Sequence, residues 1–516
     1  MGPSSGAESA APGVKQYSER TREILAFSRL RRSAFPGPAT ALPGKRSGLN
    51  TWWSWHTRLT LFASCLSRRR FGCGRRFALR ILEAQPRVST DFQPIEQSAP
   101  IHSCGDITAD ANEFISARRR RRLVKITKVE THAVSAGWKN WLFVKVCTDS
   151  DVYGISEATI NGFVATTETA VHELAHFVIG KDPRQINALA NAIITTIADA
   201  GHIHRMVMGA IEVACWDILG KTLGVPIWQL LGGKHRDSIL AYANGWYRTE
   251  RTPEHFVRVA KTVVAQGFRA LKLDPFGNAK HFSSNSDLDV AFAILHALRQ
   301  EFGPDLKLLI DVHCRFAPSE SVRIANKLAE LDIFWWEEPT TIERIELTNE
   351  IALRCPIQVA TGEQFDKVGD FETLARGGQV SIYQPEPMSL GGITNTIAVA
   401  NIAQANGAWI APHQSGGPVA TAVCLQLAAI VPNFLIQEHF DAFNEPWTRE
   451  LVTWTPAVNA ETGHLPIPTA PGLGLDLNMD AVREHPYDPN AFFDTSKAGW
   501  EKRLGTRAKH TEPQPG

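Results

Sequence analysis

Short apolar segments alternate with amphipathic segments from about residue 238 to residue 440. The amphipathic stretches, such as 287–301, 319–331 and 393–406, carry apolar residues at helical spacing. The short segments have the length of buried strands and lie at 239–245, 270–274, 306–311, 334–338, 357–363, 380–386, 408–413 and 434–438. Parallel strands need crossover helices, and eight strands close a barrel more readily than an open sheet. The pattern therefore predicts an α/β fold with a (β/α) barrel over 238–440.

A smaller α+β domain is predicted before the barrel, over 123–237. The segments VKITKVETHAV and WLFVKVCTD alternate as half-buried strands do, and a turn follows at 149–154. Helical spacing continues at 166–179 and 205–223, and Gly224 with Pro226 supplies a helix stop. Residues 441–516 are Pro-rich and lack the barrel rhythm, so we expect them to pack back on this first domain.

Residues 1–122 show no sustained period of 2 or 3.6 and end in five consecutive arginines at 118–122. The first 80 residues hold fifteen Lys or Arg and three Glu. We therefore expect a disordered basic extension. It could be an organelle transit peptide, a nucleic-acid-binding arm or an extension without function, and we favour the last.

Composition narrows the function classes. The chain has 516 residues, 44% of them apolar, and a formal charge of +1, which gives no global attraction to nucleic acid or to an anionic membrane. The apolar stretch at 59–66 is too short to span a bilayer. Eight scattered cysteines with no Cys-x-x-Cys pair fit reduced thiols. We expect a cytoplasmic protein, assembled as a homo-oligomer, with no membrane or nucleic-acid partner.

Ionisable residues stand at the ends of nearly all the predicted barrel strands, where a barrel of this kind carries its chemistry. A lone carboxylate at such a place is more often a solvated loop residue or a helix cap. Several in one barrel mouth repel one another unless a cation neutralises them or some of them remain protonated. Asp311, Glu337 and Glu363 offer three oxygen ligands from three strand ends, which suits one hard ion such as Mg²⁺.

Two histidines and a lysine are candidates for proton transfer and charge neutralisation. His313 follows Asp311 by two residues, so alternation directs both side chains to the same face, although His313 could instead cap the next helix. His413 and Glu386 end neighbouring strands and could pair, which would orient the ring and raise its basicity. Lys272 could neutralise a substrate carboxylate, or it could be a solvated loop residue.

Six motifs carry a resemblance to a known family. They are DVHCRF at 311–316, WWEEPT at 335–340, ATGEQF at 360–365, QPEPMSLGGIT at 384–394, APH at 411–413 and IQE at 436–438. The sequence from about 123 to 500 resembles the mandelate racemase and muconate-lactonising branch of the enolase superfamily, most closely its galactonate dehydratase-type acid-sugar dehydratases. The resemblance implies a modified (β/α)₇β barrel under an α+β capping domain, with one Mg²⁺ per subunit.

The resemblance also implies residue roles. Asp311, Glu337 and Glu363 would hold the metal, His413 with Glu386 would remove the α-proton, and His313 would protonate the departing β-hydroxyl. Glu438 would stabilise the enediolate, and Lys272 would bind the substrate carboxylate. Arg315, Trp138 and Asn140 are candidate substrate contacts, although the aromatic residues of the 137–141 loop could equally belong to the core of the capping domain.

The predicted activity is dehydration of an acid sugar to a 2-keto-3-deoxy acid. Two alternatives remain: a racemase, epimerase or cycloisomerase of the same superfamily, and a non-catalytic binding protein on the same barrel. Lys272-Leu273-Asp274 replaces the Lys-x-Lys motif common in the family's racemases, which argues against two-base racemisation. Glu386 stands where the family usually has Asp, which lengthens the pair with His413 by one methylene.

Overall fold

The computed structural model describes residues 124–195, 201–494 and 499–502. The predicted disorder of residues 1–122 lies outside the described residues. Among the helices that the structure describes, none combines the length and apolar character that a membrane crossing requires.

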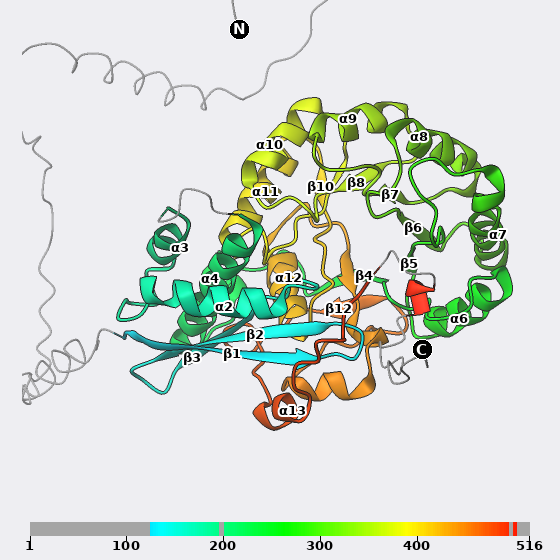
Figure 1. Cartoon of the computed structure of the whole chain (residues 1–516). Coiled ribbons are helices and arrows are strands. Elements are labelled where there is room, and N and C mark those ends of the chain that lie inside the picture. Colours follow the sequence, from blue (N-terminus) through cyan, green and yellow to red (C-terminus); the bar gives the residue numbers. More distant parts are fainter. Residues whose placement is uncertain (1–123, 196–200, 495–498, 503–516) are drawn as a thin grey trace, which may run out of the picture. The chain divides into compact units, whose positions relative to one another are not determined.

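Eight parallel strands and seven intervening helices form the barrel seen in green, yellow and orange (Figure 1). The strands are β4 (Ser238–Ala243), β5 (Ala270–Leu273), β6 (Lys307–Asp311), β7 (Trp335–Glu337), β8 (Val359–Thr361), β9 (Ile382–Tyr383), β10 (Trp409–Ile410) and β11 (Gln437–His439). The helices are α6 (Pro253–Ala265), α7 (Asn285–Phe302), α8 (Pro318–Lys327), α9 (Ile345–Arg354), α10 (Val368–Gly377), α11 (Ile393–Ala405) and α12 (Pro418–Ile430), with a short η2 (Ala329–Leu331) after α8. This is the predicted (β/α)₇β order.

The barrel closes through its last strand. β11 pairs with β4 in parallel register, and Ile410 of β10 forms a parallel bridge with Phe434, three residues before β11. Leu435 donates its N–H to the Ile410 carbonyl at 2.8 Å, which continues the contact. No strand edge of the barrel is therefore left unpaired along this seam.

Local sequence explains where the helices begin. Thr252 caps α6 and accepts the N–H of His255, with Pro253 in the first turn, where its missing N–H costs nothing. Ser284 and Asp287 form a reciprocal capping box at the start of α7. Such caps fix the point at which each loop turns back from the barrel mouth.

The first domain contains an antiparallel sheet of β1 (Ile126–Ser135), β2 (Asn140–Thr148) and β3 (Tyr153–Glu157), drawn in cyan in Figure 1. Its helices are α2 (Val164–Leu174), η1 (Ala175–Phe177), α3 (Ile186–Thr195), α4 (His202–Leu223) and α5 (Ile227–Leu230). α4 ends at Gly224, whose φ of 71° is left-handed, as the predicted stop requires. α3 is a helix that the sequence analysis did not name.

Two buried carboxylates of this domain attach it to barrel helices. Glu157 accepts the N–H groups of Gly417 and Ala420 at the start of α12, at 2.7 and 3.2 Å. Glu212 accepts the N–H groups of Ile393 and Thr394 at the start of α11, both at 3.0 Å. Negative charge at a helix N-terminus is favourable, so these contacts fix the domain above the strand ends.

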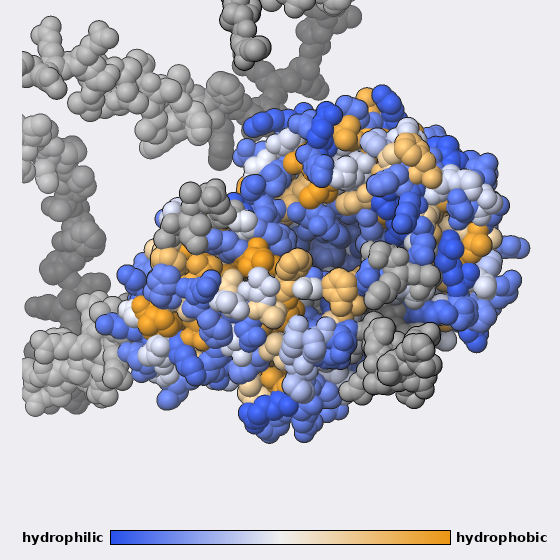
Figure 2. Space-filling view, in the orientation of Figure 1, coloured by the Kyte–Doolittle hydropathy of each residue, from blue (hydrophilic) through white to orange (hydrophobic). Residues whose placement is uncertain are grey.

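The segment after the barrel contacts both parts. It contains η3 (Asp441–Phe443), η4 (Pro446–Leu451), β12 (His464–Pro466), α13 (Met479–Glu484) and η5 (Trp500–Lys502). Its residues His485 and Pro486 contact the end of β1, and β12 pairs with β4 of the barrel. The space-filling view shows a hollow over the barrel bordered by hydrophilic residues (Figure 2).

Candidate active site

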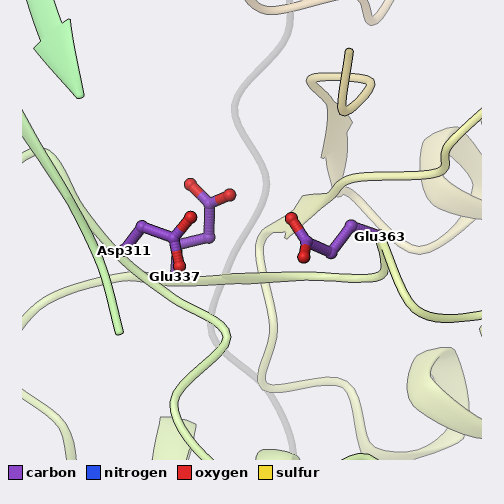
Figure 3. Close-up of side chains that lie close together, drawn as sticks. All are labelled: Asp311, Glu337 and Glu363. Carbon is purple, nitrogen blue, oxygen red and sulfur yellow. The ribbon is translucent and has the colours of Figure 1, made fainter. Parts of the chain in front are cut away.

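Three carboxylates converge at the barrel mouth. Asp311 ends β6, Glu337 ends β7 in direct register with it, and Glu363 follows β8 by two residues. One oxygen from each lies within 4.8 Å of the other two, and Glu363 points toward the pair (Figure 3). A set of carboxylate oxygens with no sulfur or nitrogen ligand fits a hard divalent cation.

Lys272 of β5 lies against this cluster. Its Nζ is 3.1 Å from Asp311 Oδ2 and 3.2 Å from Glu438 Oε1, and it contacts Glu337. Burial opposes the lysine charge, but the three carboxylates outweigh it and raise the pKa of Lys272 well above its ordinary value. Lys272 is therefore a buried cation at the site and not a solvated loop residue.

The pKa values of two of these carboxylates shift in opposite directions. Burial, with repulsion from Asp311, raises the pKa of Glu337 well above its ordinary value, although Lys272 acts in the opposite direction. Burial would also raise the pKa of Asp311, but the charges of His313 and Lys272 reverse this and lower it. The site thus holds more negative charge than its own lysine can neutralise, which favours an added cation.

His413 and Glu386 form the pair that the sequence left open. His413 Nδ1 lies 2.9 Å from Glu386 Oε2, and Nε2 lies 3.4 Å from Glu363 Oε2. Burial opposes protonation of the ring, but Glu363 and the hydrogen bond to Glu386 raise the pKa of His413 to about 10. The extra methylene of Glu386 does not prevent the contact.

His313 has a carboxylate partner of its own. Its Nδ1 lies 2.7 Å from Asp274 Oδ2, and its Nε2 lies 3.5 Å from Asp311 Oδ2. Arg315 also contacts Asp274 and donates to the Val312 carbonyl at 3.1 Å. His313 therefore faces the carboxylate cluster and does not cap α8, whose capping residue is Ala317.

Glu438 is an acceptor for several donors. Asn244 Nδ2 donates to Oε1 at 2.6 Å and the Gln414 N–H donates to Oε2 at 2.7 Å, in addition to Lys272. Burial would raise its pKa, but Lys272 and His413 outweigh burial and lower it. In this arrangement Glu438 holds Lys272 in place.

Left-handed backbone occurs at the site. His313, Cys314 and Glu338 have φ values of 47°, 57° and 46°. Such conformations cost of order 1 kcal/mol or more in a non-glycine residue and persist only where surrounding contacts hold them. Here the Cys314 N–H donates to the Glu338 carbonyl at 2.9 Å, so the two strained loops hold each other.

A cavity of about 360 Å³ opens beside the cluster, between the first domain and the barrel mouth. The barrel contributes Glu363, Glu386 and His413. The first domain contributes Lys139, Glu157, Thr159, Ile160, Asn161, His202 and Met206. A small polar ligand in this cavity would reach His413 directly.

Three predicted substrate contacts have other partners. Trp138 is buried, stacks on Phe440 at 5.5 Å, and donates to Asn444 at 3.1 Å. Asn140 donates to the carbonyls of Asp488 and Ala491. Arg315 is occupied by Asp274 and backbone carbonyls. The structure thus brings eight of the eleven predicted residues together, and these three lie in packing contacts beside them.

Sequence reasoning missed two kinds of residue. Lys139 lines the cavity, whereas its neighbours Trp138 and Asn140, which were the predicted contacts, do not. Side chains alternate in direction just before β2, and this alternation would have separated the cavity-facing position from the core-facing ones. Asp274 was considered only as the residue that replaces a second lysine. It follows Lys272 by two residues, as His313 follows Asp311, and this spacing predicts that both side chains point to the same face of the strand.

Comparison with known proteins decides the family. Residues 115–232 match the mandelate racemase / muconate lactonizing enzyme N-terminal domain, and residues 255–481 match the family described as enolase C-terminal domain-like. D-galactonate dehydratase of Pectobacterium atrosepticum is 32% identical over 367 residues, covering 70% of this chain and 94% of that protein. The chain belongs to the mandelate racemase/muconate-lactonizing enzyme family. The predicted family is therefore confirmed.

Further similarities within this family agree with the fold. D-gluconate dehydratase of Thermoproteus tenax is 29% identical over 384 residues, covering 73% of this chain and 76% of that protein. A solved mandelate racemase/muconate lactonizing enzyme from Jannaschia sp. CCS1 is 31% identical with a TM-score of 0.65, covering 70% of this chain and 98% of the other. The predicted barrel with its α+β capping domain is confirmed as a fold class.

Proposed function

We propose that this enzyme dehydrates an acid sugar, an aldonate such as galactonate, to a 2-keto-3-deoxy acid with Mg²⁺ as cofactor. The observation that carries the proposal is the convergence of Asp311, Glu337 and Glu363 between two imidazoles, His313 and His413, each paired with a carboxylate. The similarity to galactonate and gluconate dehydratases supports the reaction class.

The three carboxylates fit a magnesium ion, because they are oxygen donors, two at strand ends and Glu363 in the loop after β8, and carry surplus negative charge. When bound, the cation supplies positive charge that acidifies the α-proton of a hydroxy acid and lowers the pKa of His413 by offsetting Glu363. Lys272 adds a fixed positive charge on the β5 side, where it can neutralise the substrate carboxylate.

His413 is the proposed base. Nδ1–H of His413 donates a hydrogen bond to Glu386, so Nε2 is the atom that takes the α-proton as the C–H electron pair moves into an enediolate. His313 is the proposed acid. It gives a proton to the β-hydroxyl, the C–O bond breaks, water leaves, and the resulting enol tautomerises to the 2-keto acid. Proton loss and hydroxyl loss are thereby assigned to different imidazoles.

The role of Glu438 depends on whether its carboxylate is ionised. An enediolate oxygen accepts hydrogen bonds, and an ionised carboxylate cannot donate one. Because Lys272 and His413 lower the pKa of Glu438, it acts here through Lys272. Direct stabilisation of the enediolate by Glu438 stays a prediction, as do substrate contacts from Trp138, Asn140 and Arg315.

The test is a library of five- and six-carbon acid sugars assayed for 2-keto acid formation with Mg²⁺ and with a chelator. We expect turnover of at least one aldonate that the chelator abolishes, and an Asp311→Asn variant that needs more Mg²⁺ for the same rate. If no acid sugar loses water, the dehydratase proposal is wrong. Exchange of the α-proton in D₂O without water loss would instead support a racemase or epimerase.

We also propose the division into an extension (1–122), a capping domain (123–237), a barrel (238–440) and a C-terminal segment (441–516). Limited proteolysis should cut first near residue 122 and leave the capping domain and the barrel together in one fragment. Homo-oligomerisation and a cytoplasmic location stay predictions, which light scattering and cell fractionation measure.

A further inference from the structure

A second carboxylate–imidazole pair lies opposite the His413–Glu386 pair. We propose that Asp274 is a positioning residue that fixes the His313 ring, with Nδ1 bound and Nε2 directed at the carboxylate cluster, so that His313 serves the dehydration step alone. The proposal rests on the dehydratase function proposed above. Asp274 then has a function of its own and is more than a substitute for the second lysine of the Lys-x-Lys motif.

The Asp274 carboxylate is buried and held by several donors. It is 1% exposed, and Oδ1 accepts the Phe276 N–H at 3.0 Å. Oδ2 lies 2.7 Å from His313 Nδ1 and also contacts the Arg315 guanidinium. A carboxylate with a guanidinium partner and a backbone donor has little freedom to rotate away from the imidazole.

This contact decides which ring nitrogen is available. An ionised carboxylate only accepts hydrogen bonds, so Nδ1 of His313 must carry a proton and Nε2 is left for chemistry. Nε2 lies 3.5 Å from Asp311 Oδ2, just as Nε2 of His413 lies 3.4 Å from Glu363 Oε2. The two rings thus present the same nitrogen to opposite members of the metal-ligating set.

The surroundings of the ring leave it one orientation. Trp500 of the C-terminal segment packs edge-on against His313, with ring centroids 5.6 Å apart at 86°. The left-handed backbone at His313 brings its N–H to Asp311 Oδ1 at 2.9 Å. Arg315, predicted as a substrate contact, is on this evidence the group that holds Asp274.

The consequence is a separation of the two half-reactions. Asparagine at position 274 has one oxygen for these three donors, so its N–H₂ faces either Nδ1 and Arg315 or the Phe276 N–H. In either orientation a contact that fixes the ring is lost, and His313 delivers its proton to the β-hydroxyl less well. Abstraction of the α-proton by His413 does not involve this contact. Loss of Asp274 should therefore slow loss of water and spare α-proton exchange.

The experiment uses the full chain with Mg²⁺ in D₂O and D-galactonate, or the aldonate that turns over fastest in the screen. For Asp274→Asn we expect dehydration to fall about 100-fold. The recovered substrate should gain α-deuterium, so that the ratio of exchange to dehydration rises at least about tenfold. Asp274→Glu, which keeps the charge, should recover part of the rate, and Asp289→Asn on the exposed face of α7 should match the parent.

Two further readouts separate positioning from general damage. In a double-mutant cycle, adding Asp274→Asn to His313→Asn should cost little more, because both act through one ring. In [¹⁵N]histidine-labelled protein without substrate, the Nδ1–H signal of His313, assigned from His313→Asn, should shift or disappear in Asp274→Asn, because the carboxylate that accepts this proton's hydrogen bond is gone. Equal loss of exchange and dehydration, additive effects, or an unchanged signal would overturn the proposal. The spectroscopic result holds whether or not any aldonate turns over.

Discussion

Two successive layers of side chains inside the barrel differ in chemistry although they share one geometry. The lower layer is apolar and takes one residue from each strand region: Tyr242, Ala270, Leu309, Trp335, Ala360, Ile382, Ala411 and Ile436. Two residues further along, the same strands supply Asn244, Lys272, Asp311, Glu337, Gly362, Gln384, His413 and Glu438. Because successive inward positions on a strand are two residues apart, one rule produces both layers.

The difference shows what each layer does for the molecule. The apolar layer fills the barrel with five large side chains and three alanines, and Tyr242 packs edge-on against Trp335 with centroids 5.3 Å apart. The upper layer collects buried charges of like sign, and burial together with repulsion from the neighbouring carboxylates raises the pKa of Glu337. Stability should therefore depend on the lower layer, and activity, at a cost in stability, on the upper layer.

The largest expected effect tests the upper layer through His413. His413→Asn should lower aldonate turnover about 1000-fold, because the α-proton loses its acceptor, while Mg²⁺ affinity and the unfolding midpoint stay close to the parent values. Steady-state assays, calorimetric Mg²⁺ titration and thermal unfolding measure the three quantities. His464→Asn, in β12, is the matched control and should leave turnover unchanged. A His413→Asn protein that retains a tenth of the activity would remove His413 from the role of base.

The two-residue spacing explains which residues of these layers could be predicted from the sequence. All eight barrel strands were located, and Lys272, Asp311, Glu337, His413 and Glu438 follow from alternation along single strands. Glu363 and Glu386 lie one and two residues beyond Gly362 and Gln384, in loops, and they were predicted as the acidic ends of the longer expected strands 357–363 and 380–386. Alternation alone would have placed Gly362 and Gln384 in the site.

Contacts between strands were harder to predict. The pairing of Asp274 with His313 and the occupation of Arg315 depend on how two loops cross, and a left-handed backbone at His313 and Cys314 has no signal in residue type. The packing of Trp138 and Asn140 on the C-terminal segment joins residues more than 300 positions apart. Spacing along one strand cannot report such contacts.

A second prediction measures the electrostatic cost of the upper layer. Lys272→Met removes the cation that contacts Asp311, Glu337 and Glu438. The buried carboxylates are then uncompensated, so the free energy of unfolding in chelator should fall by about 3–5 kcal/mol. Saturating Mg²⁺ should restore a large part of this loss. Denaturant unfolding with and without Mg²⁺ gives both values, and a loss of equal size under both conditions would contradict the electrostatic account.

A third prediction concerns the lower layer. Leu309→Ala leaves a cavity two residues below Asp311 and should lower the free energy of unfolding by about 3 kcal/mol, with or without Mg²⁺. Mg²⁺ affinity should change less than about twofold, because Leu309 supplies no oxygen to the metal site and touches it only through Trp335, its register partner on β7. Unlike the loss of unfolding free energy in Lys272→Met, the loss in Leu309→Ala should not depend on Mg²⁺. A strong drop in Mg²⁺ affinity would mean that the two layers are coupled.

The smallest effect separates two metal-site residues by their register. Glu363 lies in a loop beyond the layer, whereas Glu337 lies within it and uses both oxygens, one with Lys272 and one with the Trp335 indole N–H at 2.9 Å. Glutamine at either position should lower Mg²⁺ affinity about tenfold. Glu337→Gln should in addition lose about 1–3 kcal/mol of unfolding free energy, because its N–H₂ must face one of those donors. Glu363→Gln should leave that free energy nearly unchanged. Equal destabilisation by the two variants in chelator would show that Glu363 in its loop is held as tightly as Glu337 on its strand. The position of a carboxylate on a strand or in a loop would then make no difference to its contribution to stability.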